Sequence, residues 1–181
     1  MRVDANYRFI AAYQEVNARV SQRQQALNLY VSLVVSLLAA LVALQPASGT
    51  GASLPAEWLV LGFPVATLSL ALLNFKAERA ITNLRRFLAE LERFDGAHLA
   101  LPSYNSDPRW ITSANAARRF HDHAATLLAT GGLSIGWGAA CSIYPERVLG
   151  APVLLAGGVL LGVASLLLLV ITPRFHYRPT E

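Results

Sequence analysis

The densest group of ionisable side chains is residues 118–123, a run with two arginines, two histidines and one aspartate. Side chains of these types can bind a metal ion, a phosphate or an anionic lipid headgroup. A metal site is disfavoured, because His121 and His123 are two positions apart and diverge by about 200° around a helix. We therefore expect no metal, and interpret the run as a basic collar facing solvent or lipid headgroups, or as a site for a phosphate or nucleotide.

A second basic pair, Arg85 and Arg86, lies in the same long charged segment. Arg119 and His123 are four positions apart on the expected helix, so both could pair with acids of neighbouring helices. The acids considered for this pairing are Asp4, Glu15 and Glu78. The residues expected to contact a ligand or lipid are Arg85, Arg86, Arg118, Arg119, His121 and His123.

Familiar catalytic motifs are absent from the sequence. It contains no glycine-rich phosphate loop, no nucleophile elbow and no pair of carboxylates within an apolar stretch. The one cysteine, Cys141, allows neither an intramolecular disulfide nor a cysteine-based zinc site. We therefore predict that the chain is not an enzyme and needs no cofactor.

The elements that must position these side chains follow from four uncharged apolar runs, at residues 26–44, 58–75, 124–144 and 148–172. Each run is close to the roughly 20 helical residues that cross a bilayer. Only 14% of all residues are charged, against about 25% in a soluble domain. These features predict an all-α integral membrane protein, a four-helix bundle made of two transmembrane hairpins.

The basic residues predict the orientation of this bundle. Fourteen of the 15 lysines and arginines lie before the first run, between the second and third, or after the fourth. Cytoplasmic loops carry such an excess, so both termini and residues 76–123 are expected in the cytoplasm. This bias also explains the basic character of the chain without a nucleic-acid partner. Usage rich in Ala, Leu and Arg, with a single lysine, favours a bacterial inner-membrane protein, and no cleavable signal peptide is expected.

Two apolar stripes extend beyond the runs and predict long helices. Residues 1–25 are expected to form a cytoplasmic amphipathic helix continuous with the first span, and the second span is expected to continue likewise into residues 76–123. We predict that the stripes pack as an antiparallel pair; the alternative is a helix lying flat on the membrane. The first stripe comprises Phe9, Tyr13, Val16, Val20, Leu27, Val31, Val34, Leu38 and Leu41. The second comprises Ala77, Ile81, Leu84, Leu88 and Leu91.

Proline, glycine and aspartate mark the expected helix boundaries. Pro55 is expected to start the second span and Pro64 to kink it. The dipeptide at positions 95–96 should end the helix, followed by a loop over residues 97–108. Asp107 or Ser106 is the expected N-cap of the helix that enters the third span. The resulting divisions are residues 1–25, hairpin 26–75, residues 76–123, hairpin 124–172, and a cytoplasmic tail over residues 173–181.

Small and polar residues recur every four positions inside three of the runs. This spacing lets helix backbones approach closely, so we interpret the residues as helix-packing positions, with a pore lining as the alternative. They are Asn28, Ser32 and Ser36 in the first run, Gly132 and Gly136 in the third, and Gly158 and Gly162 in the fourth.

Together these features favour a structural, interaction or regulatory membrane subunit that works through its cytoplasmic helices. The alternative is an oligomerising pore-forming or membrane-disrupting effector of the bacterial immunity or toxin type. A small transporter or membrane enzyme is a third hypothesis, and its acid or base would come from Asp107, His121, Asp122 or His123. The expected partners are the lipid bilayer and either further copies of the chain or another protein on the cytoplasmic side.

Overall fold

The computed structural model describes residues 4–44, 57–100 and 102–178, and within these residues the chain is helical without a strand. Four long helices dominate: α1 (Ala5–Ala43), α3 (Gly62–Arg93), α5 (Pro108–Ile143) and α7 (Pro152–Ile171). Short elements join them: α2 (Glu57–Val60), η1 (Phe94–Gly96), α4 (Ala97–Ala100), α6 (Pro145–Leu149) and η2 (Thr172–Phe175). The all-helical class is confirmed, and four helices are long and apolar enough to cross a membrane.

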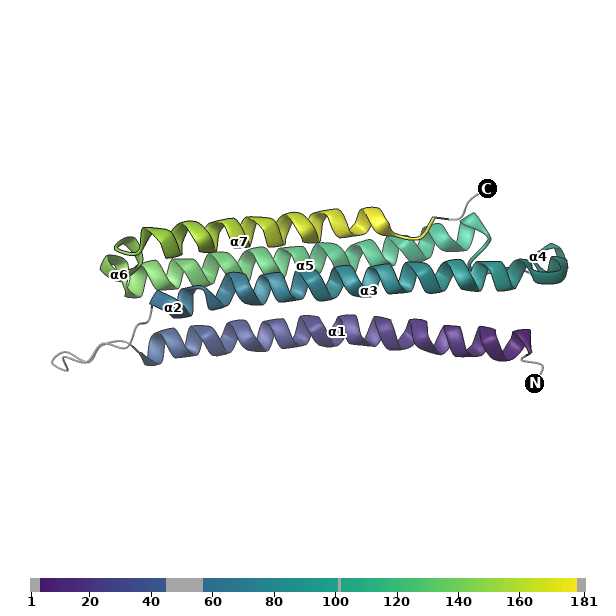
Figure 1. Cartoon of the computed structure of the whole chain (residues 1–181), viewed down its shortest axis with the longest axis horizontal. Helices are drawn as coiled ribbons and strands as arrows, with labels where there is room; N and C mark the ends of the chain where they lie inside the picture. Colours follow the sequence, from purple (N-terminus) through teal and green to yellow (C-terminus); the bar gives the residue numbers. More distant parts are fainter. Residues whose placement is uncertain (1–3, 45–56, 101, 179–181) are drawn as a thin grey trace.

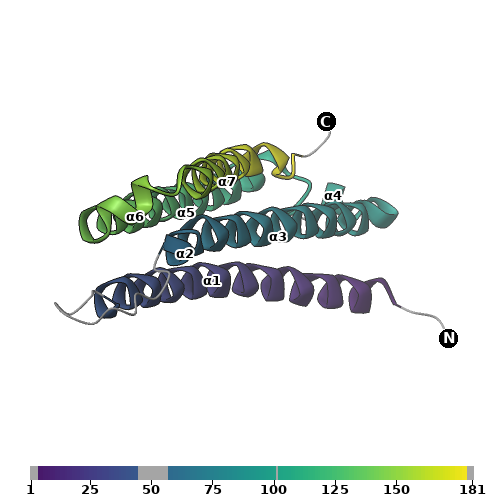
Figure 2. The ribbon, with the colours of Figure 1, turned by 60° about the vertical axis from the view of Figure 1, so that its left-hand side comes forward.

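The four long helices lie side by side in one elongated bundle (Figure 1). Helix α3 packs against both α1 and α7, and α5 also packs against both. Figure 2 shows α3 between α1 and the pair formed by α5 and α7. The start of α1, helix α4 and the end of α7 lie toward one end of the bundle, and α6 lies at the other. We call residues 4–25, 76–123 and 173–178 the polar half, and the other described residues the apolar half.

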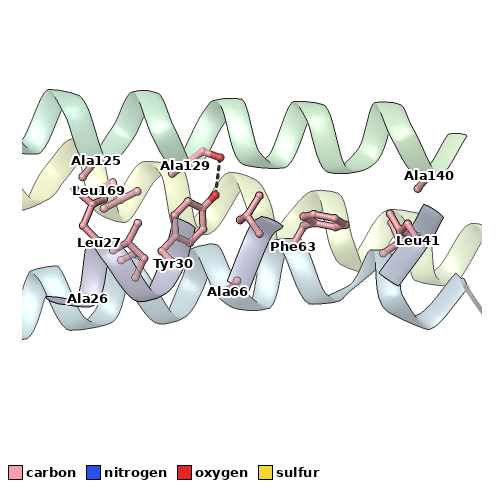
Figure 3. Close-up of a cluster of buried hydrophobic side chains, with 14 of the residues drawn as sticks. Ala26, Leu27, Tyr30, Leu41, Phe63, Ala66, Ala125, Ala129, Ala140 and Leu169 are labelled. Atoms are coloured by element: carbon pink, nitrogen blue, oxygen red, sulfur yellow. Dashed lines mark hydrogen bonds between the residues drawn. The ribbon is translucent and has the colours of Figure 1, made fainter. Parts of the chain in front are cut away.

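Large side chains of α1 and α3 fill the apolar half against small residues of α5. Tyr30 is buried facing Ala129 and Gly132 on α5, and Phe63 is buried facing Gly136 of the same helix (Figure 3). The Tyr30 hydroxyl donates to the carbonyl oxygen of Ala129 over 3.2 Å, and the Tyr144 hydroxyl donates to that of Leu41 over 2.9 Å. Because both hydroxyls have partners, burying these aromatic rings leaves no polar atom of the tyrosines unpaired.

The two predicted stripes pack against each other in the polar half. Ala12 and Val16 of α1 form one buried cluster with Ile81 and Leu88 of α3, which runs in the opposite direction. Part of the first stripe was assigned wrongly, because Tyr13, Val20 and Val31 are exposed. The side of α1 that meets α3 and α5 is rotated relative to the predicted stripe, because Ala12 and Tyr30 are buried in place of Tyr13 and Val31.

Proline determines where the second span is interrupted. The break falls at Leu61, between α2 and α3, and Pro64 lies in the first turn of α3. Pro64 has no backbone N–H to donate to the carbonyl of Val60, which accounts for a break one turn before the proline. Pro55, the expected start of this span, lies outside the described residues.

The third long helix begins as the capping signals predict. The Asp107 side chain accepts from the backbone N–H of Arg109 over 2.9 Å, so Asp107 is the N-cap and Pro108 follows in the first turn. The preceding segment is not wholly a loop, because residues 97–100 form α4. Gly96 adopts a φ of +70° just before it, a left-handed conformation that glycine tolerates best.

The fourth apolar run, residues 148–172, does not form a single helix. Its first residues belong to α6 and the following turn, and the long helix starts at Pro152. After α7 the chain forms η2 and then buries His176 and Tyr177 against the bundle. The first part of the expected tail is therefore an integral part of the polar half.

Candidate functional site

Five ionisable side chains meet inside the polar half, and each long helix or its adjoining turn supplies at least one. We call this group the ion cluster: Arg23, Glu78, Arg118, Asp122 and His176. The side chains of Arg23, Glu78 and Asp122 are only 5%, 0% and 4% exposed. Charges this deeply buried persist only when they are paired, so the cluster ties α1, α3, α5 and the segment after α7 together.

Arg23 is the central cation of the ion cluster. One of its terminal nitrogens lies 3.1 Å from a carboxylate oxygen of Glu78, and the other forms an ion pair with Asp122. Its Nε donates to Oδ1 of Asn74 over 3.3 Å. One guanidinium group thus contacts α3 at two positions and α5 at a third. The planar fork of arginine suits such simultaneous contacts, which a lysine ammonium would not reproduce.

His176 connects the segment after α7 to the cluster. Its Nε2 lies 3.0 Å from Oδ2 of Asp122 and 3.7 Å from a carboxylate oxygen of Glu78. An ionised carboxylate only accepts hydrogen bonds, so Nε2 carries the proton in the bond to Asp122. Nearby, the Thr82 hydroxyl donates to the carbonyl oxygen of Phe175 over 2.8 Å. These two bonds fix the turn in which the chain leaves the apolar half.

The charges of the cluster balance when its histidine is neutral. Arg23 and Arg118 oppose Glu78 and Asp122. Burial lowers the pKa of Arg118 to about 10, with Glu78 partly offsetting the effect, so Arg118 stays charged at neutral pH. Burial also lowers the pKa of His176, against the opposing influence of Glu78. His176 is consequently neutral near pH 7, and protonating it would add an unbalanced buried charge.

His121 borders the cluster and responds to pH in the same direction. Burial lowers its pKa to about 4, and the charge of Arg23 contributes. Its Nε2 is buried without a hydrogen-bond partner in the described part of the chain, as are Nδ2 of Asn74 and both terminal nitrogens of Arg118. The cluster therefore retains spare hydrogen-bonding capacity around a balanced set of charges. No group of His, Cys, Asp and Glu among the described residues could hold a metal ion.

The basic residues expected to contact a ligand or lipid fall into two groups. Arg118 and His121 point toward the interior, and Arg85 is half-buried close enough to Arg118 to lower the pKa of that arginine. Arg86, Arg119 and His123 are exposed. The expected pairing was misplaced by one residue: Arg118, rather than Arg119, lies 3.4 Å from a Glu78 carboxylate oxygen. Helical periodicity explains the shift, since positions 118 and 122 share the inward face of α5.

The small and polar residues of the apolar runs also divide. Asn28, Ser32 and Ser36 are exposed on α1, where the Ser36 hydroxyl donates back to the carbonyl oxygen of Ser32 over 2.8 Å. The four glycines are buried inside the bundle. A Cβ added at any of the four would meet a side chain of another helix. Gly132, Gly136, Gly158 and Gly162 face Tyr30, Phe63, Trp137 and Leu133, respectively.

Outside the ion cluster, a further carboxylate holds the loop before α5 in place. The Glu92 carboxylate accepts from the backbone N–H groups of Asn105 and Ser106, at 2.9 and 3.0 Å. It also accepts from the Asn105 amide over 2.7 Å and the Ser106 hydroxyl over 2.9 Å. Four donors on two residues satisfy one carboxylate, so Glu92 holds this loop against the end of α3.

Sequence patterns underestimated the ion cluster. Arg23, Glu78 and His176 were not among the expected site residues, and Asp122 was considered only as an acid or base. All four lie just outside the apolar runs, within four residues of an end. A search for charges inside the runs therefore does not find them. One signal was available: Arg23 is seven residues from both Val16 and Tyr30, which places it on the buried stripe.

The geometry defines a helical bundle with four candidate membrane spans and a buried cluster of charges beside them. No protein-family model, curated protein or solved structure matches the chain.

Proposed function

We propose that this chain is a self-associating, non-enzymatic membrane subunit whose polar half lies in the cytoplasm and provides an interaction or regulatory surface. The excess of basic residues in the polar half supports this orientation. The proposal extends to a bacterial inner membrane, with both termini on the cytoplasmic side. The observation that carries it is a second stripe on α1, which faces away from the bundle.

This outer stripe follows steps of three and four residues along the exposed side of α1. In the apolar half it contains Val35 and Val42, both 59% exposed, and Val31, which is also exposed. Leu38 lies at the edge of the stripe, where it is partly buried against the core of the bundle. In the polar half the same steps reach exposed polar side chains, which are amides except for one serine. The complete outer stripe is Gln14, Asn17, Ser21, Gln24, Asn28, Val31, Val35, Leu38 and Val42.

Within the span, the residue types at the first heptad position of the outer stripe match those of a parallel two-stranded coiled coil. Asn28, Val35 and Val42 occupy one heptad position, and Val31 and Leu38 occupy the other. β-Branched residues at the first position with leucine at the second favour parallel dimers, and a single asparagine at the first position sets their register. Two copies inserted in the same orientation can meet only in parallel, around an axis normal to the membrane.

Asn28 adds a reason for the copies to associate. It lies two residues inside the first apolar run, on the exposed side of α1, and its side chain has no hydrogen-bond partner among the described residues. An unpaired amide facing hydrocarbon is unfavourable, and amides at this depth bond across helices. The symmetry of a dimer would place the two Asn28 side chains next to each other.

The ion cluster gives this assembly a route for regulation. Its five residues fix the positions of all four helices where the spans meet the polar half. A partner that repacked the polar half would have to break or rearrange these ion pairs. Packed interfaces of this kind switch between discrete arrangements rather than deforming gradually.

Disulfide cross-linking tests the proposal at the outer stripe. In a Cys141→Ser background, Val35→Cys should form a covalent dimer in native membranes under mild oxidation, because a two-fold axis brings identical residues together. Leu33→Cys is the matched control, since Leu33 is 47% exposed at a similar depth but on another side of α1. Equal cross-linking of both variants, or of neither, would contradict the proposal.

The outward position of Ser32 and Ser36 favours one alternative, an oligomerising pore-forming or membrane-disrupting effector. An assembly of several copies through α1 would bring these hydroxyls together within the span, where they could line a narrow path. Vesicles containing the protein should then leak an encapsulated dye, and Ser32→Leu with Ser36→Leu should prevent the leak. Intact vesicles at high protein density would eliminate this alternative.

A further inference from the structure

A cavity of about 280 Å³ lies in the polar half, between the first turns of α5 and the segment that follows α7. Its wall includes Arg119 and Arg178 together with Thr112, Asn115 and His176. We propose that this cavity binds a phosphate group, carried either by a lipid headgroup or by a soluble phosphate.

The wall of the cavity is positively charged. Arg119 and Arg178 are exposed. Among the described residues, no carboxylate lines the cavity and neither arginine forms an ion pair. The nearby Asp107 is already held by Arg109, whose guanidinium lies 2.7 Å from its carboxylate. The cavity thus presents two uncompensated guanidinium groups, which bind phosphate oxygens through paired N–H donors.

Asn115 narrows the chemistry of the ligand. Its amide nitrogen donates to the carbonyl oxygen of Tyr177 over 3.0 Å, which fixes the side chain. Its Oδ1 is buried and accepts no hydrogen bond from the described part of the chain. A ligand with both anionic oxygens and an O–H donor would satisfy this wall. Inorganic phosphate and a phosphatidylglycerol headgroup each carry both.

The cavity lies close to the end of the fourth apolar run. Pro173, which lines it, directly follows the fourth apolar run, so a lipid headgroup at the membrane surface can reach it. His176 lines the cavity on one side and contacts Asp122 of the ion cluster on the other. An occupant would therefore act directly on the residue that anchors the segment after α7.

A second groove, of about 220 Å³ between α1 and α3, is a weaker anion site. Two arginines line it, but Arg19 pairs with Glu15, and Arg23 pairs with the acids of the ion cluster. Only Lys76 contributes a cation without a partner among the described residues. Free positive charge therefore distinguishes the cavity at α5 from this groove.

Binding is measured on the full-length protein purified in a neutral detergent. Inorganic phosphate is titrated by calorimetry, and retention of phosphatidylglycerol is compared with that of phosphatidylcholine by native mass spectrometry. For whichever probe binds, the double variant Arg119→Gln/Arg178→Gln should lower the affinity by about tenfold for each charged hydrogen bond lost. Thr112→Glu should abolish binding through repulsion, and a glutamate near the start of α5 is compatible with the helix.

Arg174→Gln is the matched control, because it removes the same charge from the same segment without lining the cavity. Phosphate binding that only the cavity variants weaken identifies a soluble ligand, and phosphatidylglycerol retention that only they weaken identifies a lipid. If neither probe distinguishes the double variant from Arg174→Gln, the proposal is overturned. The cavity lies within a single copy of the chain, so this result is independent of self-association.

Discussion

The guanidinium of Arg23 on α1 forms a buried ion pair with the carboxylate of Asp122 on α5. The same guanidinium contacts Glu78 on α3, and Asp122 contacts His176 after α7. Two residues far apart in the sequence therefore connect all four long helices. This relationship makes the ion cluster testable, because the effect on stability of substituting one residue should depend on whether the other is present.

Arg23→Met should destabilise the bundle by about 3–5 kcal/mol, because it leaves Asp122 buried without its cation. Asp122→Asn should also be costly, and the double variant should cost less than the sum of the two, because Glu78 and Arg118 still balance each other. Reversible unfolding in mixed micelles measures these free energies. The partly exposed pair Arg19–Glu15 is the control, and removing it should change stability by less than about 1 kcal/mol. An equal cost for Arg19→Met and Arg23→Met would argue against the cluster.

Stability should fall as the pH is lowered from about 6.5 toward 4. Burial lowers the pKa of His121 from 6.5 to about 4, so the unfolded chain binds a proton before the folded chain does. At 1.36 kcal/mol per pKa unit the full shift would correspond to about 3.4 kcal/mol, and the loss from this residue is smaller because His121 is only half-buried and solvent screens its charge. The lowered pKa of His176 acts in the same direction.

His121→Gln should flatten this dependence between pH 7 and pH 5, because glutamine does not titrate. His123→Gln, at an exposed histidine of the same helix, provides the comparison in the same unfolding assay. The explanation fails if the two variants change the pH dependence to the same extent.

Gly136→Ala should destabilise the apolar half by about 1–3 kcal/mol, the usual cost of overpacking a core. A Cβ at position 136 would lie 2.5 Å from Cγ of the buried Phe63. Gly138→Ala on the same helix meets no atom within 4 Å and should be neutral or slightly stabilising. Unfolding measured side by side should separate the two variants, and equal stabilities would show that Phe63 does not pack there.

Glu92→Gln should loosen the loop before α5 while leaving the spans intact. The substitution removes the negative charge that accepts hydrogen bonds from four donors of Asn105 and Ser106. Hydrogen bonds to a charged group contribute about 1.5–3 kcal/mol, so the loop should be destabilised by about this amount. Hydrogen exchange followed by mass spectrometry should show faster exchange over residues 103–107. Glu90→Gln, at an exposed position of the same helix, should leave that exchange unchanged.

Sequence patterns were most informative where periodicity and capping act locally. The four helices and the Asp107 cap follow from short-range rules. The pairing of Val16 with the Ile81 stripe follows from the matching apolar periodicity of the two helices. The partner of a charged residue depends on the rotation of each helix, which a shift of one position changes. For this reason Arg118 was not distinguished from Arg119 as the residue that meets Glu78.

The buried position of His176 could not be predicted from the sequence. It depends on a turn after α7 that returns the chain to the bundle, and Thr172 and Pro173 suggest only that the helix ends. The outer stripe of α1 was equally hidden, because apolar residues cover most of that helix within the span. Only the packing of α1 against α3 and α5 shows which valines remain exposed.

Asn28→Val isolates the contribution of the amide to self-association. Hydrogen bonds between membrane helices contribute about 0.6–2 kcal/mol, so the dimer should dissociate roughly 3- to 30-fold more readily. Fluorescence energy transfer between labelled copies, diluted progressively in lipid vesicles, measures this equilibrium. Ser32→Val, which changes a polar residue beside the outer stripe, should have a smaller effect. A larger effect of Ser32→Val would relocate the interface.

The number of copies per membrane particle tests the central claim most directly. The full chain, labelled at Cys141 and reconstituted in bilayers at low density, can be counted by single-molecule photobleaching. The account predicts two bleaching steps for the wild-type chain and mainly one step for a variant with Val35→Arg on the outer stripe. A wild-type chain that bleaches in a single step at every density would contradict the proposed self-association.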